Sequence, residues 1–340
     1  MRKGNTIQNK LFKHPTICCL IGSIVVILMF LVSIGLGAIP IPLDVMIDAL
    51  LSFQPDKIEH QLIWEVRLPR ALVALFVGAA LAVAGAIMQG VTQNALADPS
   101  IIGVTHGAGL AIAICLAVLS SGSYWMLLCW SFVGAAVAST MVLAFSSISK
   151  ERFSPITITL AGVALSTLFS ALSTGIALYF QVAQDVSFWF SGGLSGSKWE
   201  HVYILIPIVL IGFILSLWIS HPLTLLSLGE DVSTGLGHSN YTTRMIGLTS
   251  VILLSGAAVS VAGTISFIGL IIPHIVRLLV GNDYRWIVPS SAIAGAFLLL
   301  SADILARIIN APFETPVSAI TSVLGVPILL HLARRRRRSI

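Results

Sequence analysis

Five charged side chains of this chain have types and spacing that could do chemistry, although they lie beside long apolar stretches. Arg67 and Arg70 stand just before one stretch, and Asp303, Arg307 and Glu314 lie near the end of another. If these stretches cross a membrane, guanidinium groups at the outer face could dock an acidic partner or steer an anionic substrate. Snorkelling of the charged ends toward lipid headgroups is the alternative.

A second set of polar residues interrupts the apolar pattern inside or beside such stretches. Gln89 and Asn94 belong to a segment of amides, glycine and proline over residues 89–99. Such a segment indicates non-helical backbone, tolerated at membrane depth only inside protein or beside water, and an ordinary turn fits equally well. His274 follows Pro273 and could relay protons, although a hydrogen-bonded structural histidine explains it more simply.

The third feature is a glycine-punctuated, partly acidic stretch at residues 220–240, between two long apolar runs. Its length allows two short helices joined by a glycine turn. A membrane protein with so little polar mass has little room for a catalytic domain outside the membrane. If its work needs metabolic energy, that energy must come from another protein, and this stretch is the segment predicted to receive it. Its candidate coupling residues are Leu228, Gly229, Glu230, Asp231, Gly235 and Gly237.

Composition fixes the class of protein. Apolar residues make up 56% of the chain, charged residues 10%, and the mean hydropathy is +0.98. Soluble domains carry about 25% charged residues. A membrane-spanning helix needs about 20 apolar residues, and the runs are continuous rather than alternating, which excludes a β-barrel. An all-α polytopic protein is predicted, with about ten spans at residues 16–38, 70–91, 102–121, 125–146, 156–180, 202–219, 241–262, 266–280, 286–306 and 316–333. Because Pro273 falls in the short eighth run, we expect a broken helix there.

Basic residues set the expected orientation. With the N-terminus in the cytoplasm, ten spans leave 14 of the 19 Lys and Arg inside and 5 outside. Both termini are therefore predicted to be cytoplasmic, with an N-terminal segment at 1–15 and a basic tail at 334–340. The tail is interpreted as a topology anchor near anionic lipid, not as a nucleic-acid site. The first apolar run is interpreted as a retained span, because no small-residue cleavage site follows it.

Nothing in the sequence indicates catalytic, metal or cofactor chemistry. The four cysteines, Cys18, Cys19, Cys115 and Cys129, lie in apolar runs without a CxxC spacing. The chain also has no phosphate-binding loop of the type that holds ATP, so ATP hydrolysis would belong to another chain. We expect a transport subunit, not an enzyme.

An internal repeat predicts the architecture. Residues 78–87 and 256–265 are identical at seven of ten positions. They fall in spans 2 and 7. Because these spans are an odd number apart along the chain, they cross the membrane in opposite directions. Inverted repeats are common in transporters, and spans 2–5 and 7–10 would be the two halves of one domain over residues 1–340. Chance similarity between small-residue helices is the alternative.

Ten segments together resemble the FecCD family of ABC-transporter permeases, which includes cobalamin and ferric-siderophore importers. They are residues 67–70, 78–85, 88–89, 94–99, 103–108, 160–165, 267–274, 303–307, 314–321 and 325–327. One departure is Ala95, where family members usually have proline. The resemblance implies a ten-helix permease in the cytoplasmic membrane, a second permease that is a copy or a paralogue, two cytoplasmic ATPase subunits and an extracytoplasmic binding protein.

The resemblance also implies roles for particular residues. Arg67, Arg70 and Arg307 match positions that meet acidic residues of the binding protein, and the 220–240 stretch would couple to the ATPase. Spans 5, 8 and 10 would line the pathway, for which Gln89, Asn94 and His274 are candidates. Phe188, Trp189 and Phe190 form an outer aromatic cluster that could touch substrate, although an interfacial belt explains them more simply.

The function that this resemblance implies is import of an iron chelate, with a ferric siderophore as the first candidate and cobalamin or haem next. An ion-coupled secondary carrier is a different class of alternative, and it needs a carboxylate on the pathway. The sequence offers none centrally placed. A purely structural membrane scaffold is disfavoured by the inverted repeat.

Overall fold

The computed structural model describes residues 15–37, 41–119, 124–148, 155–191, 193–311 and 313–336. Residues 1–14 of the predicted N-terminal segment, and Arg337 and Arg338 of the tail, lie outside the described residues. Where it is described, the chain is helical and contains no strand. The helices are α1 (Pro15–Gly35), α2 (Leu43–Leu51), α3 (Ile58–Gln61), the π-helix η2 (Leu62–Arg67), α4 (Leu68–Val91), the 3-10 helix η3 (Pro99–Ile102), α5 (Val104–Val118), α6 (Tyr124–Ile148), α7 (Pro155–Tyr179), α8 (Ala183–Phe190), α9 (Trp199–Trp218), α10 (Ser220–Leu226), α11 (Glu230–Gly235), α12 (Asn240–Ala262), α13 (Ile268–Val280), α14 (Tyr284–Ile308) and α15 (Val317–Arg336).

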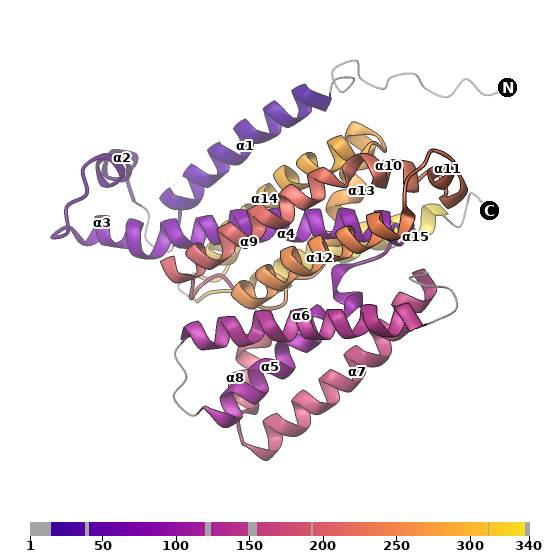
Figure 1. Cartoon of the computed structure of the whole chain (residues 1–340). Helices are drawn as coiled ribbons and strands as arrows, with labels where there is room; N and C mark the ends of the chain where they lie inside the picture. Colours follow the sequence, from indigo (N-terminus) through magenta and orange to yellow (C-terminus); the bar gives the residue numbers. More distant parts are fainter. Residues whose placement is uncertain are drawn as a thin grey trace.

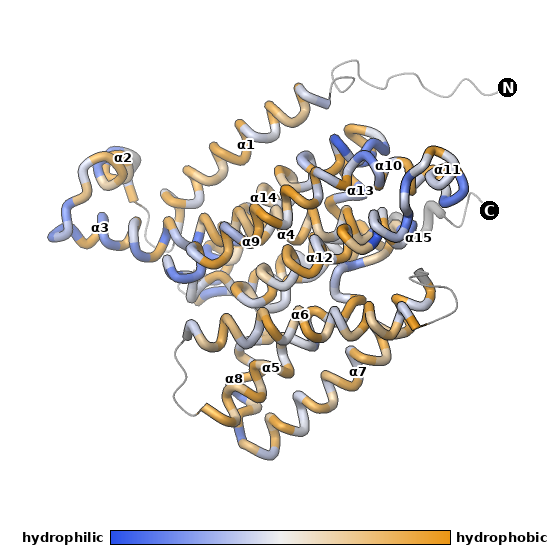
Figure 2. Tube along the Cα trace, in the orientation of Figure 1, coloured by the Kyte–Doolittle hydropathy of each residue, from blue (hydrophilic) through white to orange (hydrophobic). Residues whose placement is uncertain are grey.

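Ten of these helices confirm the predicted spans, namely α1, α4, α5, α6, α7, α9, α12, α13, α14 and α15. Within the described ranges seven are long and apolar enough to cross a membrane, and the apolar parts of α5, α13 and α15 are shorter. Figure 2 shows the apolar residues along the bundle and the polar ones gathered toward its two ends. Bilayer thickness fixes the length of a span, so composition alone locates these helices.

The two ends of the bundle differ. The start of α1 and the end of α15 lie at the same end as α10 and α11, and α2 and α3 lie at the opposite end (Figure 1). We call the end with α10 and α11 the inner end and the other the outer end. The sequence did not predict α2, α3 or α8, because helices of four to nine residues leave no long apolar run.

Helices α4 and α12, which carry the repeated segments, run in opposite directions and pack against each other (Figure 1). Each also packs against the third span of the opposite half, α4 against α14 and α12 against α6. A Cβ at Gly78 of α4 would overlap the backbone of Gly295 in α14, and one at Gly256 of α12 would lie 3.4 Å from the Phe132 ring of α6. Both repeated segments therefore pack against the third span of the other half, as expected for an inverted repeat, and the approach at Gly78 is the closer of the two.

Helix α13 corrects one prediction, because it is continuous through Pro273 from Ile268 to Val280. Proline has no N–H to give to the carbonyl four residues earlier, which is that of Gly269. The side-chain amide of Gln89 donates to that carbonyl oxygen across 3.2 Å. A side chain from the neighbouring span therefore satisfies the acceptor, and the helix does not break.

Candidate translocation pathway and its two ends

A buried charge network closes the outer end of the bundle. The guanidinium of Arg70 donates from Nε to Asp303 Oδ1 at 2.9 Å and from Nη1 to Glu314 Oε1 at 2.6 Å. Arg307 donates from Nη2 to the second oxygen of Asp303. Asp303 is fully buried, so both of its oxygens are engaged by arginines and its charge is balanced inside the protein.

The same network holds the end of α1. Arg67 donates from Nη1 to the carbonyl oxygens of Ile34 and Gly35 at 2.8 and 2.7 Å. Arg307 donates from Nη1 to the carbonyl oxygen of Ser33 at 3.0 Å and from Nη2 to its hydroxyl at 2.8 Å. These bonds satisfy carbonyls that the end of a helix leaves without intrahelical partners.

The structure therefore places the three arginines of the predicted docking site inside the protein. Arg67, Arg70 and Arg307 are only 5%, 5% and 6% exposed. Of the acids that they contact, Glu314 has a side chain that is 43% exposed. A charge at the edge of the hydrocarbon must be paired or hydrogen-bonded, and these residues find their partners within the chain. Their role in docking stays a prediction.

A second polar network lies at the inner end of α4. The amide of Gln89 donates to the carbonyl oxygens of Gly269 and Leu270, each at 3.2 Å, and its oxygen accepts from Arg277 Nη1 at 2.6 Å. Arg277 also donates to the hydroxyl of Tyr284 at 3.1 Å. Because Gln89 is buried, the network fixes the start of α13 against α4 and α14.

Hydrogen bonds attach helix α10 to the bundle. Gln93, just beyond α4, donates from Nε2 to the carbonyl oxygen of Leu226 at 2.8 Å. The hydroxyl of Thr224 accepts from the backbone N–H of Tyr284 at 2.9 Å, which holds α10 to the first residue of α14. Gly90 permits close packing here, because a Cβ at that position would lie 2.7 Å from the Tyr284 hydroxyl.

The turn before α14 is also ordered by charge. Asp283 accepts a hydrogen bond from the backbone N–H of Arg285 at 3.0 Å and caps the helix. The guanidinium of Arg285 donates to the same carboxylate and lowers the pKa of Asp283 below its usual value. Asp283 therefore stays ionised at neutral pH and keeps its capping bond.

The 220–240 stretch forms the two short helices that the sequence predicts, α10 and α11. The chain between them turns at Gly229, whose φ of 126° suits glycine, and leaves α11 at Gly237, whose φ is 82°. Glu230 begins α11 and pairs with Arg244 of α12 at 2.5 Å, and Leu228 is 65% exposed. Asp231 and Gly235 lie on α11, where Asp231 adds negative charge to the first turn. The pair is a compact element exposed at the inner end.

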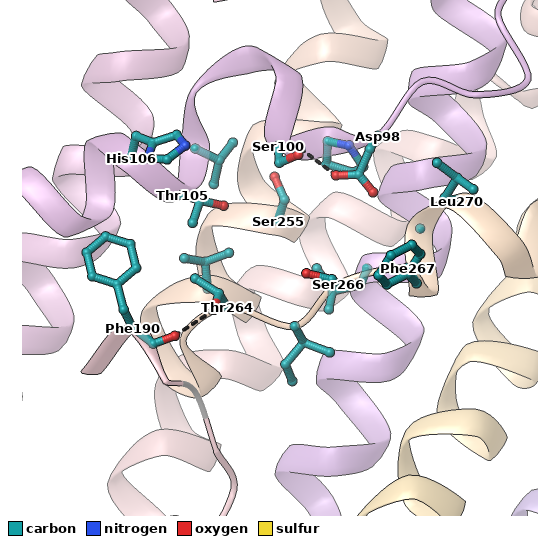
Figure 3. A pocket seen from close by; sticks show the side chains of 16 residues that line it. Asp98, Ser100, Thr105, His106, Phe190, Ser255, Thr264, Ser266, Phe267 and Leu270 are labelled. Carbon is teal, nitrogen blue, oxygen red and sulfur yellow. Dashed lines mark hydrogen bonds between the residues drawn. The ribbon is translucent and has the colours of Figure 1, made fainter. Parts of the chain in front are cut away.

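An inner cavity of about 440 Å³ lies between α4, the η3–α5 junction, α12 and the start of α13. Figure 3 shows Thr105, Ser255, Thr264 and Ser266 around this space, with His106 on the left and Asp98 on the right of the view. The hydroxyl of Thr264 donates to the carbonyl oxygen of Phe190 at 2.6 Å, and Asp98 accepts from the N–H of Ser100 at 2.9 Å. Hydroxyls with a few aromatic rings suit a polar organic ligand.

An outer cavity of about 600 Å³ lies between α5, α8, the end of α12 and the α14–α15 connection. Arg70 and Glu314 of the outer network line it, as do Phe188 and Trp189. The next residue along α8, Phe190, lines the inner cavity. The end of α8 therefore lies between the two cavities, which are in series from the outer end toward the middle of the bundle.

The structure separates the predicted pathway residues into two groups. Phe188 and Trp189 line the outer cavity. Gln89, Asn94 and His274 line neither cavity. Gln89 belongs to the inner network, and Asn94 accepts a hydrogen bond from the N–H of Leu96 in the turn after α4. His274 is half-buried on α13.

No group of three or more metal-ligating side chains occurs among the residues that the structure describes. The expected absence of a metal or cofactor site stays a prediction for the whole chain.

Comparison with known proteins identifies the transporter type. The model of the FecCD transport family matches residues 25–335. The chain belongs to this family. It is therefore a membrane permease, as its segment pattern predicted, and its work is transport.

Named relatives of this FecCD permease support the same assignment. The iron(3+)-hydroxamate import system permease protein FhuB of Bacillus subtilis is 50% identical over 308 residues, which cover 91% of this chain and 80% of that protein. The iron-uptake system permease protein FeuB of the same organism is 41% identical, over 91% of this chain and 92% of that protein. A solved structure described as an inward-facing conformation of a putative metal-chelate type ABC transporter aligns with a TM-score of 0.83 at 29% identity, over 95% of this chain and all of the other.

Sequence reasoning missed several residues that hold the site together. Gln93 and Thr224 attach α10 to the bundle, and Arg277 and Tyr284 complete the inner network. Gln93 stood in the amide segment and Arg277 stood near His274, so each position carried a weak signal. Their partners are far away in the sequence, and no spacing rule connects them.

Proposed function

We propose that this permease is the membrane subunit of an ATP-driven importer that carries a ferric siderophore, with an iron hydroxamate as the first candidate. The observation that carries the proposal is the pair of cavities in series, which Trp189 and Phe190 border from adjacent positions. Volumes of about 600 and 440 Å³ lie within the range of about 300–1,000 Å³ for small-molecule sites. The names of the two Bacillus subtilis permeases point to iron, and one of them to hydroxamates.

The proposed partners follow the two ends of the bundle. An ATPase dimer binds at α10 and α11, and a solute-binding protein docks over the outer network that contains Arg67, Arg70 and Arg307. A second permease, a copy or a paralogue, completes the pathway. Helices α7 and α15 are spans 5 and 10, which the family resemblance assigns to the pathway, so they would lie near that partner.

Coupling would pass from α10 to the cavities through contacts that the chain already makes. Gln93 connects α10 to the end of α4, and Gln89, one turn earlier, holds the carbonyls at the start of α13. Gly269 and Leu270 at that start also line the inner cavity. A movement of α10 driven by the ATPase would therefore change the inner cavity, provided that the two ATPase states bind α10 and α11 differently.

The proposed orientation has both termini in the cytoplasm of a cell whose cytoplasmic membrane holds the chain. The inner end, with α10 and α11, then faces the ATPase. The basic residues of the sequence favour this orientation over the reverse.

A secondary carrier is less well supported. Such a carrier needs a carboxylate that gains and loses a proton or ion on the pathway. Asp303 is the fully buried acid of the described chain, and Arg70 and Arg307 engage both of its oxygens. Asp98 and Asp185, two of the acids that line the cavities, are partly or fully exposed at helix N-termini and do not form a buried site in the middle of a span.

Growth and uptake on defined chelates test the proposal. Cells with and without this gene are tested on one nutrient at a time. A ferric hydroxamate or haem is supplied as the iron source, and cobalamin is supplied in a medium on which growth depends on it. We expect loss of radiolabelled ferric hydroxamate uptake in the deleted strain, with cobalamin and haem use unchanged. Normal hydroxamate uptake combined with loss of either of the other two would assign the runner-up substrate instead.

A further inference from the structure

One face of α8 presents a carboxylate and two aromatic rings to the outer cavity. Asp185, Phe188 and Trp189 are three and four residues apart, so they lie on one side of the helix. All three line the cavity of about 600 Å³. Phe188 is 82% exposed although it is a large apolar side chain, which leaves its ring free to contact a ligand.

The charges around this face are unequal. Among the described residues that line the outer cavity, Arg70 is the sole lysine or arginine, and its positive charge is paired with the carboxylate of Glu314, which also lines the cavity. Asp185 is exposed and makes no hydrogen bond or ion pair with a described residue. The lining of the outer cavity therefore carries one uncompensated negative charge.

The lining of the inner cavity also has more negative than positive side chains. The residues that line it include the carboxylate of Asp98, and no lysine or arginine lines it within the described chain. A ligand that passes from one cavity to the other therefore meets carboxylates, hydroxyls and aromatic rings, but no free cation. Such a path disfavours a polyanion, because its charge would lose water without gaining a positive partner.

We propose that the α8 face of Asp185, Phe188 and Trp189 selects chelates by charge at the outer cavity and favours positive or neutral ferric complexes over negative ones. A carboxylate beside aromatic rings attracts a cationic organic group through Coulomb and cation–π interactions. This inference rests on the proposed function, since it presumes an iron-chelate cargo.

A structural role of Asp185 is the competing explanation. A negative charge in the first turn of a helix is stabilised by the helix dipole, and Asp185 occupies the first turn of α8. That role would change the amount of folded permease and would affect all chelates alike. Charge selection would change the ratio between chelates, so the two explanations predict different results.

The test uses one linear ferric trihydroxamate in three forms. Its terminal amine is left free, acetylated or succinylated, which makes the complex singly positive, neutral or singly negative with the same iron-binding groups. Initial ATP-dependent uptake is measured in proteoliposomes that contain the assembled transporter, with saturating loaded binding protein. For each chelate, the variant rate is divided by the wild-type rate, so the preference of the binding protein cancels.

We expect Asp185→Asn to lower the ratio of positive to negative chelate uptake about three- to tenfold, the size of one unit charge acting across a partly solvated site. Asp185→Glu should keep the wild-type ratio. Asp44→Asn is the matched control, because Asp44 is an exposed acid in the first turn of α2 and does not line the cavity. It should leave the ratio unchanged.

Equal losses for all three chelates in Asp185→Asn, or a ratio equal to that of Asp44→Asn, would overturn charge selection while leaving the proposed function intact. If Asp185→Asn yields no folded permease, the Asp185→Glu ratio and a Phe188→Leu variant decide instead. Phe188→Leu should also reduce uptake of the positive form most, and uniform loss there counts against the proposal. A wild-type transporter that moves none of the three chelates would reject the proposed function itself.

Discussion

Gln93 donates a hydrogen bond from its side-chain amide to the carbonyl oxygen of Leu226 across 2.8 Å, and so joins the end of α4 to the last residue of α10. One turn earlier on α4, Gln89 holds the start of α13, where the inner cavity begins. These two glutamines give α10 a direct mechanical connection to the cavity wall.

Replacing Gln93 by methionine should weaken coupling without unfolding the permease. Methionine is similar in size but cannot donate to Leu226, and a single hydrogen bond contributes only about 0.5–1.5 kcal/mol to stability. We expect the ATPase to respond less to loaded binding protein, with thermal stability nearly unchanged. Stimulated ATP hydrolysis and chelate uptake are measured in proteoliposomes. Gln54→Met at the outer end is the control, and equal behaviour of the two variants would remove Gln93 from the coupling path.

A flexible Gly-Ser pair inserted after Gly229 should uncouple transport from ATP hydrolysis. The insertion separates α10 from α11, which together form the exposed element at the inner end. The permease should still insert and fold, since Thr224 and Gln93 continue to hold α10. We expect loss of chelate uptake and of ATPase stimulation by loaded binding protein. Wild-type values of both would show that this stretch is only a connection.

The two acids of the outer network should differ in their contribution to stability. Asp303→Asn leaves Arg70 and Arg307 buried with one partner fewer, which typically costs about 3–5 kcal/mol. Glu314 is partly exposed, so Glu314→Gln should cost less than about 1 kcal/mol. Thermal unfolding in detergent compares the two variants. Equal shifts in melting temperature would contradict the burial that the structure assigns to Asp303.

The test of the docking prediction must separate a loss of binding from a loss of folding. Reversing the charges at Arg67 and Arg70 should slow association with the binding protein at low salt. Because both arginines are buried and bonded within the chain, reversal also threatens the fold. Association rates are therefore informative only for variants with a wild-type melting temperature. A folded double variant that binds at the wild-type rate would place docking elsewhere.

The close approach of α4 and α13 depends on a glycine. A Cβ at Gly85 would overlap the backbone of Gly269, whereas a Cβ at Gly175 in α7 has open space around it. Gly85→Ala should destabilise the permease by about 1–3 kcal/mol or more, since backbone must move to make room. Gly175→Ala should be neutral or stabilising by up to about 1 kcal/mol. The monodisperse fraction after gel filtration and the melting temperature measure both effects.

The spans could be predicted from the sequence because the bilayer imposes its length and polarity requirement on each segment separately. Each span had to supply enough apolar residues to cross the bilayer, so its position could be read without knowledge of its neighbours. Gly229 and Gly237 likewise marked the limits of α11 by their own backbone preferences. Both predictions depend on a few adjacent residues, and the structure agrees with the positions of the spans and with the limits of α11.

The parts that the sequence did not predict are long-range pairings. Arg70 and Asp303 are 233 residues apart, and Gln93 and Leu226 are 133 residues apart. No periodicity connects such positions, so the arginines were expected at an accessible outer site although their guanidinium groups are turned into the protein. The cavity role of Phe188 and Trp189 depended on where α8 packs, which its eight residues do not reveal.

The measurement that tests the central claim most directly is uptake of a radiolabelled ferric hydroxamate into proteoliposomes that contain this permease, its partner permease and its ATPase, with loaded binding protein on the outside. ATP or a non-hydrolysable analogue is enclosed in the vesicles, and an ionophore removes any ion gradient. We predict uptake that requires hydrolysable ATP and persists with the ionophore. Uptake that proceeds with the analogue and stops with the ionophore would contradict the account and identify an ion-coupled carrier.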